Sequence, residues 1–366
     1  MKTISLISFL LLLAISIPCV NVYAQVDYSP IDPSGYIKKY DTTFTGTGPK
    51  VYFLPEPQRT SKSIVEEFSI ISTFKDSIQD AHAQQELLRS FEYTSNHNSI
   101  INIIKEDSIT IKNYRKAIDY QTDAQNTTIA IGLLNEFARL YTQNKDYQQA
   151  ESLLEKALDL AQESKEVVLE QTILSNLSAL YTFNKKYNKA SLIEDAFYET
   201  AKKDKSVTDQ GKSLVKIALL EAYQKDFKTA ESTIIRKAIP LFNRTKDYNE
   251  KINAWINLAR IYTLDKRFIE AQWFLIQAQE LADLKNIKHY NMVIEYMLGS
   301  SKFYQENLNV SKKELNKALI LAKENNNKYI ELATIQMLGE ISVKQNRLND
   351  AESLLKSYWK LRDELF

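Results

Sequence analysis

Small and apolar residues recur with a period of about forty positions along most of the chain. One column holds small residues at intervals of 40, 40, 41, 40 and 40: Ala150, Ala190, Ala230, Ala271, Ser311 and Ala351. Twelve positions earlier lies a second small residue, each directly after a large apolar one: Ala138, Ser178, Ala218, Ala259, Gly299 and Gly339. Columns that stay in phase over six copies indicate an internal repeat.

Each copy predicts two amphipathic helices joined by a short polar turn. In the copy around Ala271, apolar residues recur at spacings of three and four over 252–264 and again over 268–278. Small residues are needed where two helix axes approach closely. Because neither helix can bury its apolar stripe alone, neighbouring copies must stack and share a core. The sequence therefore predicts an all-α solenoid of helix-turn-helix repeats.

The residues at these columns resemble the tetratricopeptide repeat (TPR) consensus, most closely at Trp255, Leu258, Ala259, Tyr262, Phe268, Ala271 and Ala278. Other copies depart from it: Glu194 and Phe197 stand where leucine and alanine are usual, and Lys302 and Ser342 replace a tyrosine. The usual TPR has 34 residues, so this chain is similar to a long-helix subclass. The resemblance covers residues 128–366 as six repeats. It implies a right-handed superhelix that binds protein or peptide on its concave face.

In the TPR family the first helix of each repeat lines the concave face. Projected onto this chain, that pattern gives eight candidate groove residues: Asn135, Arg139, Gln143, Asn253, Arg260, Tyr296, Tyr304 and Gln336. Asparagine and arginine can hold backbone amides and a carboxylate, and tyrosine supplies rigid contact area. The set does not reproduce the lysine–asparagine clamp of TPR chaperone cofactors, so an acidic tail ligand is not implied.

The first 127 residues divide into three parts. Residues 1–24 combine Lys2, an apolar run over 4–17 and the sequence Val22–Ala24, a pattern typical of a cleaved secretory signal peptide. An uncleaved anchor is the alternative. Residues 25–62 hold five of the seven prolines and predict an extended lead-in. Residues 63–127 show helical stripes outside the consensus and predict a degenerate repeat preceded by a capping helix.

The C-terminal end lacks the polar capping helix that usually closes a solenoid. The last predicted helix is instead rich in apolar residues up to Trp359 and Phe366. Four explanations stay open: a truncated chain, an end-on-end homodimer, a partner that completes the stack, or apolar residues that all face inward.

Composition narrows the function. Lys and Arg number 47 against 46 Asp and Glu, and removal of Lys2 with the signal brings the net charge from +1 to zero, which disfavours nucleic acid as a partner. The three histidines have no metal-ligand spacing, and the single cysteine, Cys19, lies within the signal segment. We expect neither catalysis, a cofactor, a metal, nor a membrane span in the mature chain.

The sequence thus predicts an exported, periplasmic or secreted, bacterial TPR protein that binds protein or peptide through a concave groove. The arrangement also resembles the exported sensory regions of TPR-bearing bacterial sensor kinases. Two alternatives follow: the extracytoplasmic sensory part of a signalling system, or a scaffold subunit of an envelope assembly or secretion machine.

Overall fold

The computed structural model describes residues 59–366, apart from the side chains of 75–78, and residues 60–366 form one compact unit. Within these residues the regular structure is helical. The signal segment and most of the lead-in lie outside the described residues. Four helices precede the repeats: α3 (Ser61–Ser72), α4 (Lys75–Ser90), α5 (His97–Glu106) and α6 (Tyr114–Asp123).

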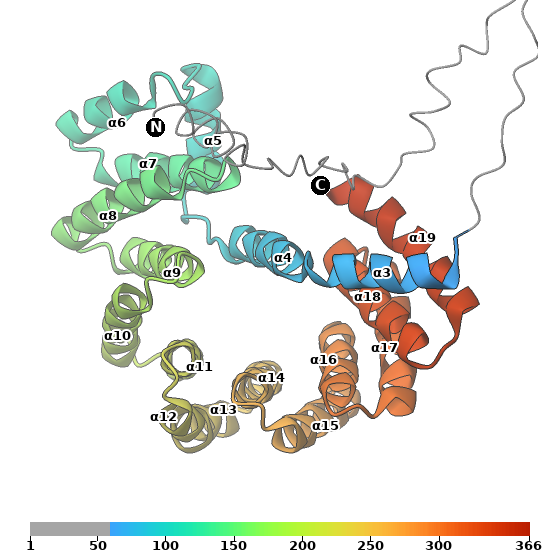
Figure 1. Ribbon diagram of the computed structural model, residues 1–366. Helices are drawn as coiled ribbons and strands as arrows, with labels where there is room; N and C mark the ends of the chain where they lie inside the picture. The colour runs from blue at the N-terminus through green and yellow to red at the C-terminus, as the bar shows by residue number, and fades with distance from the viewer. Residues whose placement is uncertain (1–58) are drawn as a thin grey trace, which may run out of the picture. The chain divides into compact units, whose positions relative to one another are not determined.

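Six helix pairs follow and correspond to the six predicted repeats. They are α7 (Thr127–Gln143) with α8 (Tyr147–Ser164), α9 (Val167–Phe183) with α10 (Tyr187–Lys203), α11 (Val207–Tyr223) with α12 (Phe227–Ser232) and α13 (Ile239–Thr245), α14 (Tyr248–Leu264) with α15 (Phe268–Leu284), α16 (Asn291–Tyr304) with α17 (Leu308–Glu324), and α18 (Lys328–Lys344) with α19 (Leu348–Leu365). Consecutive helices pack on one another (Figure 1). The predicted all-α solenoid is confirmed.

The turns between these helices repeat twice as often as the sequence columns. Each contains one residue in the left-handed conformation, from Lys145 to Asn346, at intervals of 20 residues with one interval of 21. A left-handed residue just after a helix lets the last carbonyls of that helix find backbone donors. The two helices of a repeat therefore have nearly equal length and end in the same way.

The 41-residue interval has a local structural cause. The interval of 21 lies between Lys225 and Lys246, and within it residues Thr233–Ala238 form a π-helical turn between α12 and α13. A π-turn inserts one residue without ending the helix. Pro240, at the start of α13, has no backbone N–H to donate to the preceding turn.

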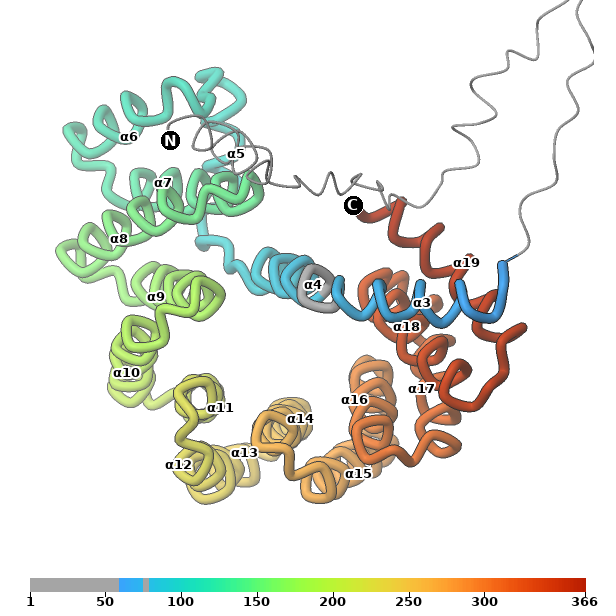
Figure 2. Tube along the Cα trace, viewed as in Figure 1, coloured from blue at the N-terminus to red at the C-terminus, as the bar shows by residue number. Residues whose placement is uncertain are grey.

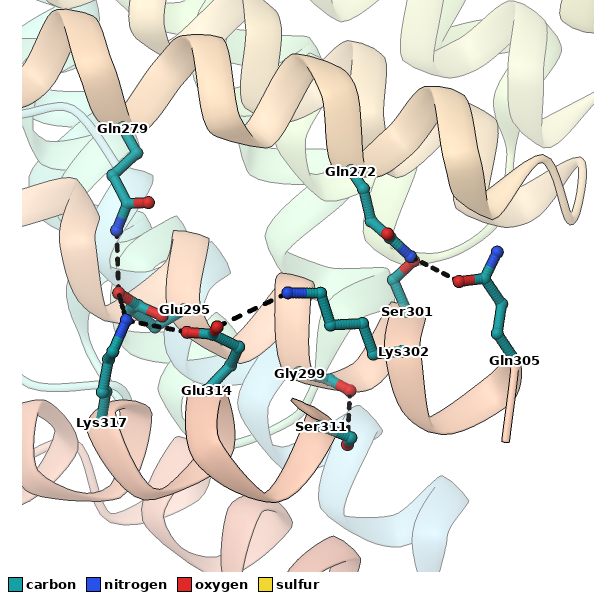
Figure 3. A network of polar contacts seen from close by, with 10 residues as sticks. All are labelled: Gln272, Gln279, Glu295, Gly299, Ser301, Lys302, Gln305, Ser311, Glu314 and Lys317. Carbon is teal, nitrogen blue, oxygen red and sulfur yellow. Dashed lines mark hydrogen bonds and ion pairs between the residues drawn. The ribbon is translucent and has the colours of Figure 1, made fainter. Parts of the chain in front are cut away.

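The small columns mark close approaches between helices. All six residues of the column from Ala150 to Ala351 are fully buried. In the fifth repeat, the Ser311 hydroxyl donates to the Gly299 carbonyl oxygen at 2.8 Å, so the two columns touch directly (Figure 3). A Cβ atom on Gly299 would lie 2.7 Å from Leu315 Cγ. Only a very small residue allows α16 and α17 to approach so closely.

Helices α5 and α6 form the degenerate pair before the first repeat. Ile100 of α5 is fully buried against Gly132 of α7. Tyr114 of α6 stacks on Phe137 of α7 with 4.7 Å between the ring centroids. The pair thus extends the stack by one imperfect repeat.

Helix α3 does not pack beside the degenerate repeat, where the sequence predicts a capping helix. It contacts α18 and α19 of the last repeat instead (Figure 1). Ile64, Phe68 and Ile71 share a buried cluster with Tyr358 and Leu361. Trp359 Nε1 donates to Glu67 Oε1 at 2.6 Å. Helix α3 therefore covers Tyr358 and Leu361 of α19 from within the chain, whereas Phe366 stays exposed.

Helix α4 lies on the inner side of the helix array. Figure 2 shows it between α9 and α18, and it contacts α7, α9 and α18. The first helices of the repeats, from α7 to α18, face this side, and the second helices lie outside them (Figure 1). Helices α3 and α4 thus form an arm, the α3–α4 arm, in which α3 lies on the last repeat and α4 crosses the face that the TPR resemblance assigns to ligands.

Candidate functional site

An extended segment of the chain itself lies against the first helices of two repeats. Residues 91–94, which we call the linker segment, follow α4 in the connection to α5, and Phe91 has extended backbone angles of φ −69° and ψ 116°. Phe91 and Thr94 are buried, whereas Glu92 and Tyr93 between them are exposed. The segment contacts the inner face without being part of any helix.

Two asparagines from neighbouring repeats hold the backbone of Glu92. Asn176 of α9 accepts from the Glu92 N–H at 2.7 Å and donates to the Glu92 carbonyl oxygen at 2.9 Å. Asn135 of α7 donates to the same carbonyl at 3.1 Å and accepts from Asn176 at 2.8 Å. Both side chains are almost fully buried. We call this arrangement the asparagine clamp; it recognises backbone and so requires no particular side chain.

The Glu92 side chain is recognised separately. Ser175 Oγ donates to Glu92 Oε1 at 2.8 Å and accepts from Lys216 Nζ at 3.3 Å. Lys216 in turn forms an ion pair with Glu194 at 3.2 Å, and Glu194 also accepts from Ser213 at 3.1 Å. Glu194, one of the departures from the TPR consensus, is fully buried. A buried carboxylate is costly unless it is paired, and here the pair fixes Lys216 beside Ser175.

The Tyr93 ring packs against a charged side chain of α7. The guanidinium of Arg139 lies 5.7 Å from the Tyr93 ring centroid, and the ring also packs on His97 at 4.2 Å. Arg139 and His97 both face the buried carboxylate of Glu136, with His97 Nδ1 3.6 Å from it. The hydrogen bond to Glu136 is the main reason that the pKa of Arg139 is raised, so the guanidinium stays charged.

The structure brings only part of the predicted groove set together. Asn135 and Arg139 belong to the site around the linker segment. Tyr296 and Gln336 line a small cavity of about 40 Å³ with Gln79 of α4, enough for a few water molecules.

The other four predicted residues lie elsewhere. Gln143 is exposed at the end of α7, and Tyr304 stacks on Phe268 at 5.8 Å. Asn253 bonds to Glu250 and Asn257 of its own helix. Arg260 lies near His82 of α4, where burial is the main cause that lowers the pKa of the imidazole and Arg260 adds to it.

Asn176 and Lys216 are not among the predicted groove residues, although the repeat contains a signal for both. Two positions before the second small column, the first four repeats carry polar residues: Glu136, Asn176, Lys216 and Asn257. These positions are apolar in the last two repeats, at Met297 and Met337. Polar residues at one column in four successive repeats indicate one stripe of the inner face. Asn176 contacts the linker segment directly, and Glu136 and Lys216 contact residues that surround it.

A second polar network joins α15, α16 and α17 (Figure 3). Gln279 donates to Glu295 at 2.8 Å, and Lys317 bridges Glu295 at 3.2 Å and Glu314 at 2.9 Å. Lys302, which replaces a consensus tyrosine, pairs with Glu314 at 3.5 Å. Burial and then the Glu314 carboxyl raise the pKa of Glu295. Burial alone would raise the pKa of Glu314. Its interactions with Glu295, Lys317 and Lys302 outweigh burial and lower this pKa to about 2.

The stability of the Glu295→Gln variant relative to the wild type should increase as pH rises. A carboxyl with a raised pKa in the folded state stabilises it fully below the unfolded pKa, and this contribution is lost as pH rises through the folded value. Glutamine does not titrate. The difference in unfolding free energy, variant minus wild type, should therefore increase between about pH 4 and pH 7. Urea unfolding across that range measures it, with exposed Glu280→Gln as control; a difference independent of pH would contradict this assignment.

Within residues 59–366, no group of three or more His, Cys, Asp or Glu side chains could hold a metal ion. No helix in this part of the chain is long and apolar enough to cross a membrane.

The stacked helix pairs place the molecule in the class of helical-repeat proteins. Residues 131–164, most of α7 and all of α8, match the tetratricopeptide repeat family model. The match and the stacked helix pairs show that the chain contains tetratricopeptide repeats. No curated protein matches the chain in sequence.

Several solved structures match the chain. A signal transduction ATPase with numerous domains from Pyrococcus horikoshii, which has a tetratricopeptide repeat sensor, matches with a TM-score of 0.51 at 13% identity, over 84% of this chain and 53% of that one. The apo form of RapI matches at 0.47 and 14% identity, over 69% and 97%. A Rap protein complexed with competence and sporulation factor matches at 0.44 and 12% identity, over 84% and 99%. At these identities the likeness concerns the fold.

Proposed function

We propose that this protein is an exported, non-catalytic TPR protein that binds extended peptide segments on the first helices of its repeats. The observation that carries the proposal is the asparagine clamp, in which Asn135 and Asn176 make three hydrogen bonds to the backbone of one residue, Glu92, directly after the extended Phe91. A buried amide group left without a hydrogen-bond partner would cost about 1–3 kcal/mol of stability. A site of this kind is satisfied only when an extended backbone occupies it.

Export belongs to the same proposal and rests on the pattern of residues 1–24. The N-terminal sequence of the protein recovered from its producing cells checks it, and should begin at Gln25. A retained Met1 would contradict export by a cleaved signal.

The peptide-binding function can be tested by selection from a displayed peptide library. Both the wild-type chain and a Glu92→Pro variant serve as bait, because proline removes the N–H that Asn176 accepts and suits the extended backbone of Phe91 before it. We expect selected peptides whose affinity falls about tenfold in Asn135→Ala. Exposed Asn188→Ala is the matched control. Failure of both baits to select a peptide that depends on Asn135 would overturn the proposal.

A sensory role for the same site is the second candidate. The observation that favours it is the position of the α3–α4 arm, which contacts both the first and the last repeats and meets the clamp at its end. Because the linker segment follows α4 directly, a ligand that displaced the segment would also shift α4 relative to the repeats. Small-angle scattering should then change on peptide binding; an unchanged profile would leave simple binding as the function.

A further inference from the structure

The recognition of Glu92 has a general part and a selective part. The asparagine clamp holds main-chain groups that every residue except proline offers. The selective part is the hydrogen bond from Ser175 to the carboxylate, together with Lys216 behind it. Ser175 accepts from the ammonium and donates to the carboxylate, so its single proton is directed at an acceptor on the bound residue.

The ammonium group of Lys216 behind Ser175 is held by a buried carboxylate, which is costly to place inside a repeat. A TPR has an apolar residue at the position of Glu194, yet here a fully buried carboxylate is paired with Lys216. Replacement of a buried ion pair by apolar side chains is often neutral or stabilising. The pair therefore contributes a positioned ammonium group on the inner face rather than simple stability, and that group favours an anionic side chain at the clamped position.

The linker segment occupies this subsite as part of the same chain. Its Phe91 and Thr94 side chains are buried, whereas Glu92 and Tyr93 are exposed; the segment follows α4 directly, and residues 95 and 96 separate it from α5. A tethered segment acts at a high effective concentration, of the order of millimolar. A free peptide must compete with it, and its apparent affinity falls by the fraction of molecules whose site is open.

We propose that the asparagine clamp is a subsite for an extended peptide with an acidic residue at the clamped position, and that Glu92 occupies it in cis as a stand-in until such a peptide displaces the linker segment. The inference rests on the proposed peptide-binding function and specifies the ligand class. It assigns three selective residues, Ser175, Lys216 and Glu194, none of which belongs to the candidate set projected from the TPR pattern.

The first experiment measures binding of the chain's own segment in trans. A fluorescent peptide with the sequence of residues 88–97 is titrated into the wild type and into Glu92→Pro. We expect about tenfold or more tighter binding to the variant, because its own segment no longer fills the clamp. Equal affinity for the two proteins would overturn occupation in cis.

The second experiment tests selection for the carboxylate. The same peptide with glutamine in place of its glutamate should bind Glu92→Pro about tenfold more weakly than the parent peptide. This ratio should collapse towards one when Lys216→Met is added, since methionine keeps the length of the side chain but removes the ammonium. Lys203→Met, an exposed lysine at the end of α10, should leave the ratio unchanged. Equal binding of the two peptides to Glu92→Pro would overturn selection for an acidic residue.

A third measurement needs no variant. The Glu92 amide donates to buried Asn176 and should exchange slowly with deuterium in the free wild-type protein. Saturation with the acidic peptide should accelerate its exchange, because the linker segment leaves the clamp. Protection that is unchanged at saturation would overturn displacement.

The outcomes separate the two proposals. If the library yields Asn135-dependent ligands but the acidic peptide does not bind, peptide binding stands and the acidic subsite falls. If neither yields a ligand that depends on Asn135, both fall together. If the acidic peptide binds both proteins equally and depends on Lys216, the selectivity stands and occupation in cis falls.

Discussion

Replacement of Phe68 by alanine should lower the free energy of unfolding by about 3–5 kcal/mol, the range for truncation of a buried phenylalanine. The ring is 3% exposed and lies directly on the backbone of Gly339, where a Cβ atom would come within 2.2 Å of it. It joins α3 to α18 and thereby completes the last repeat. Its loss should also free the apolar side of α19 and cause concentration-dependent association.

Denaturant unfolding and light scattering measure these two effects of Phe68→Ala. Helix stacks gain stability mainly from nearest neighbours, so hydrogen exchange should accelerate in α18 and α19 more than in α9 and α10. The matched control is Val65→Ala on the same helix, whose side chain is 45% exposed and should change stability by less than about 0.5 kcal/mol. An unchanged midpoint in Phe68→Ala would show that α3 does not cap the last repeat.

Replacement of Asn176 by alanine should cost about 2–4 kcal/mol, because it removes a buried side chain that makes three hydrogen bonds. The Glu92 N–H loses its acceptor, and Asn135 Oδ1 loses its donor. Asn135→Ala should cost less, about 1–2 kcal/mol, since Asn176 still holds both backbone groups of Glu92. The same order should appear in the exchange rate of the Glu92 amide.

The asparagine comparison has a built-in reference. Asn188 lies on the exposed side of α10, and its replacement by alanine should change stability by no more than about 0.5 kcal/mol. If Asn176→Ala cost no more than Asn188→Ala in denaturant unfolding, the linker segment would not be held as described.

The repeat pattern predicts some residues of the site around the linker segment but not the segment itself. The pattern placed Asn135 and Arg139 on the inner face, and both contact the linker segment or its neighbours. Asn176 and Lys216 lie on the same face, at a column adjacent to the projected one, and could have been found by a search for polar residues in phase. No periodic signal could indicate that Glu92 fills the site, because its segment lies outside the repeat and contacts residues 83 and 84 positions away.

The sequence by itself determined the helices, the six stacked repeats and the buried small columns. These follow from local periodicity, since every contact between neighbouring helices joins residues at a fixed offset along the chain. The tertiary structure alone decided that α3 closes the C-terminal end and that the linker segment occupies the clamp. Trp359 and Glu67 meet across 292 residues, and an apolar stripe on a helix specifies that it must be covered without specifying by which surface.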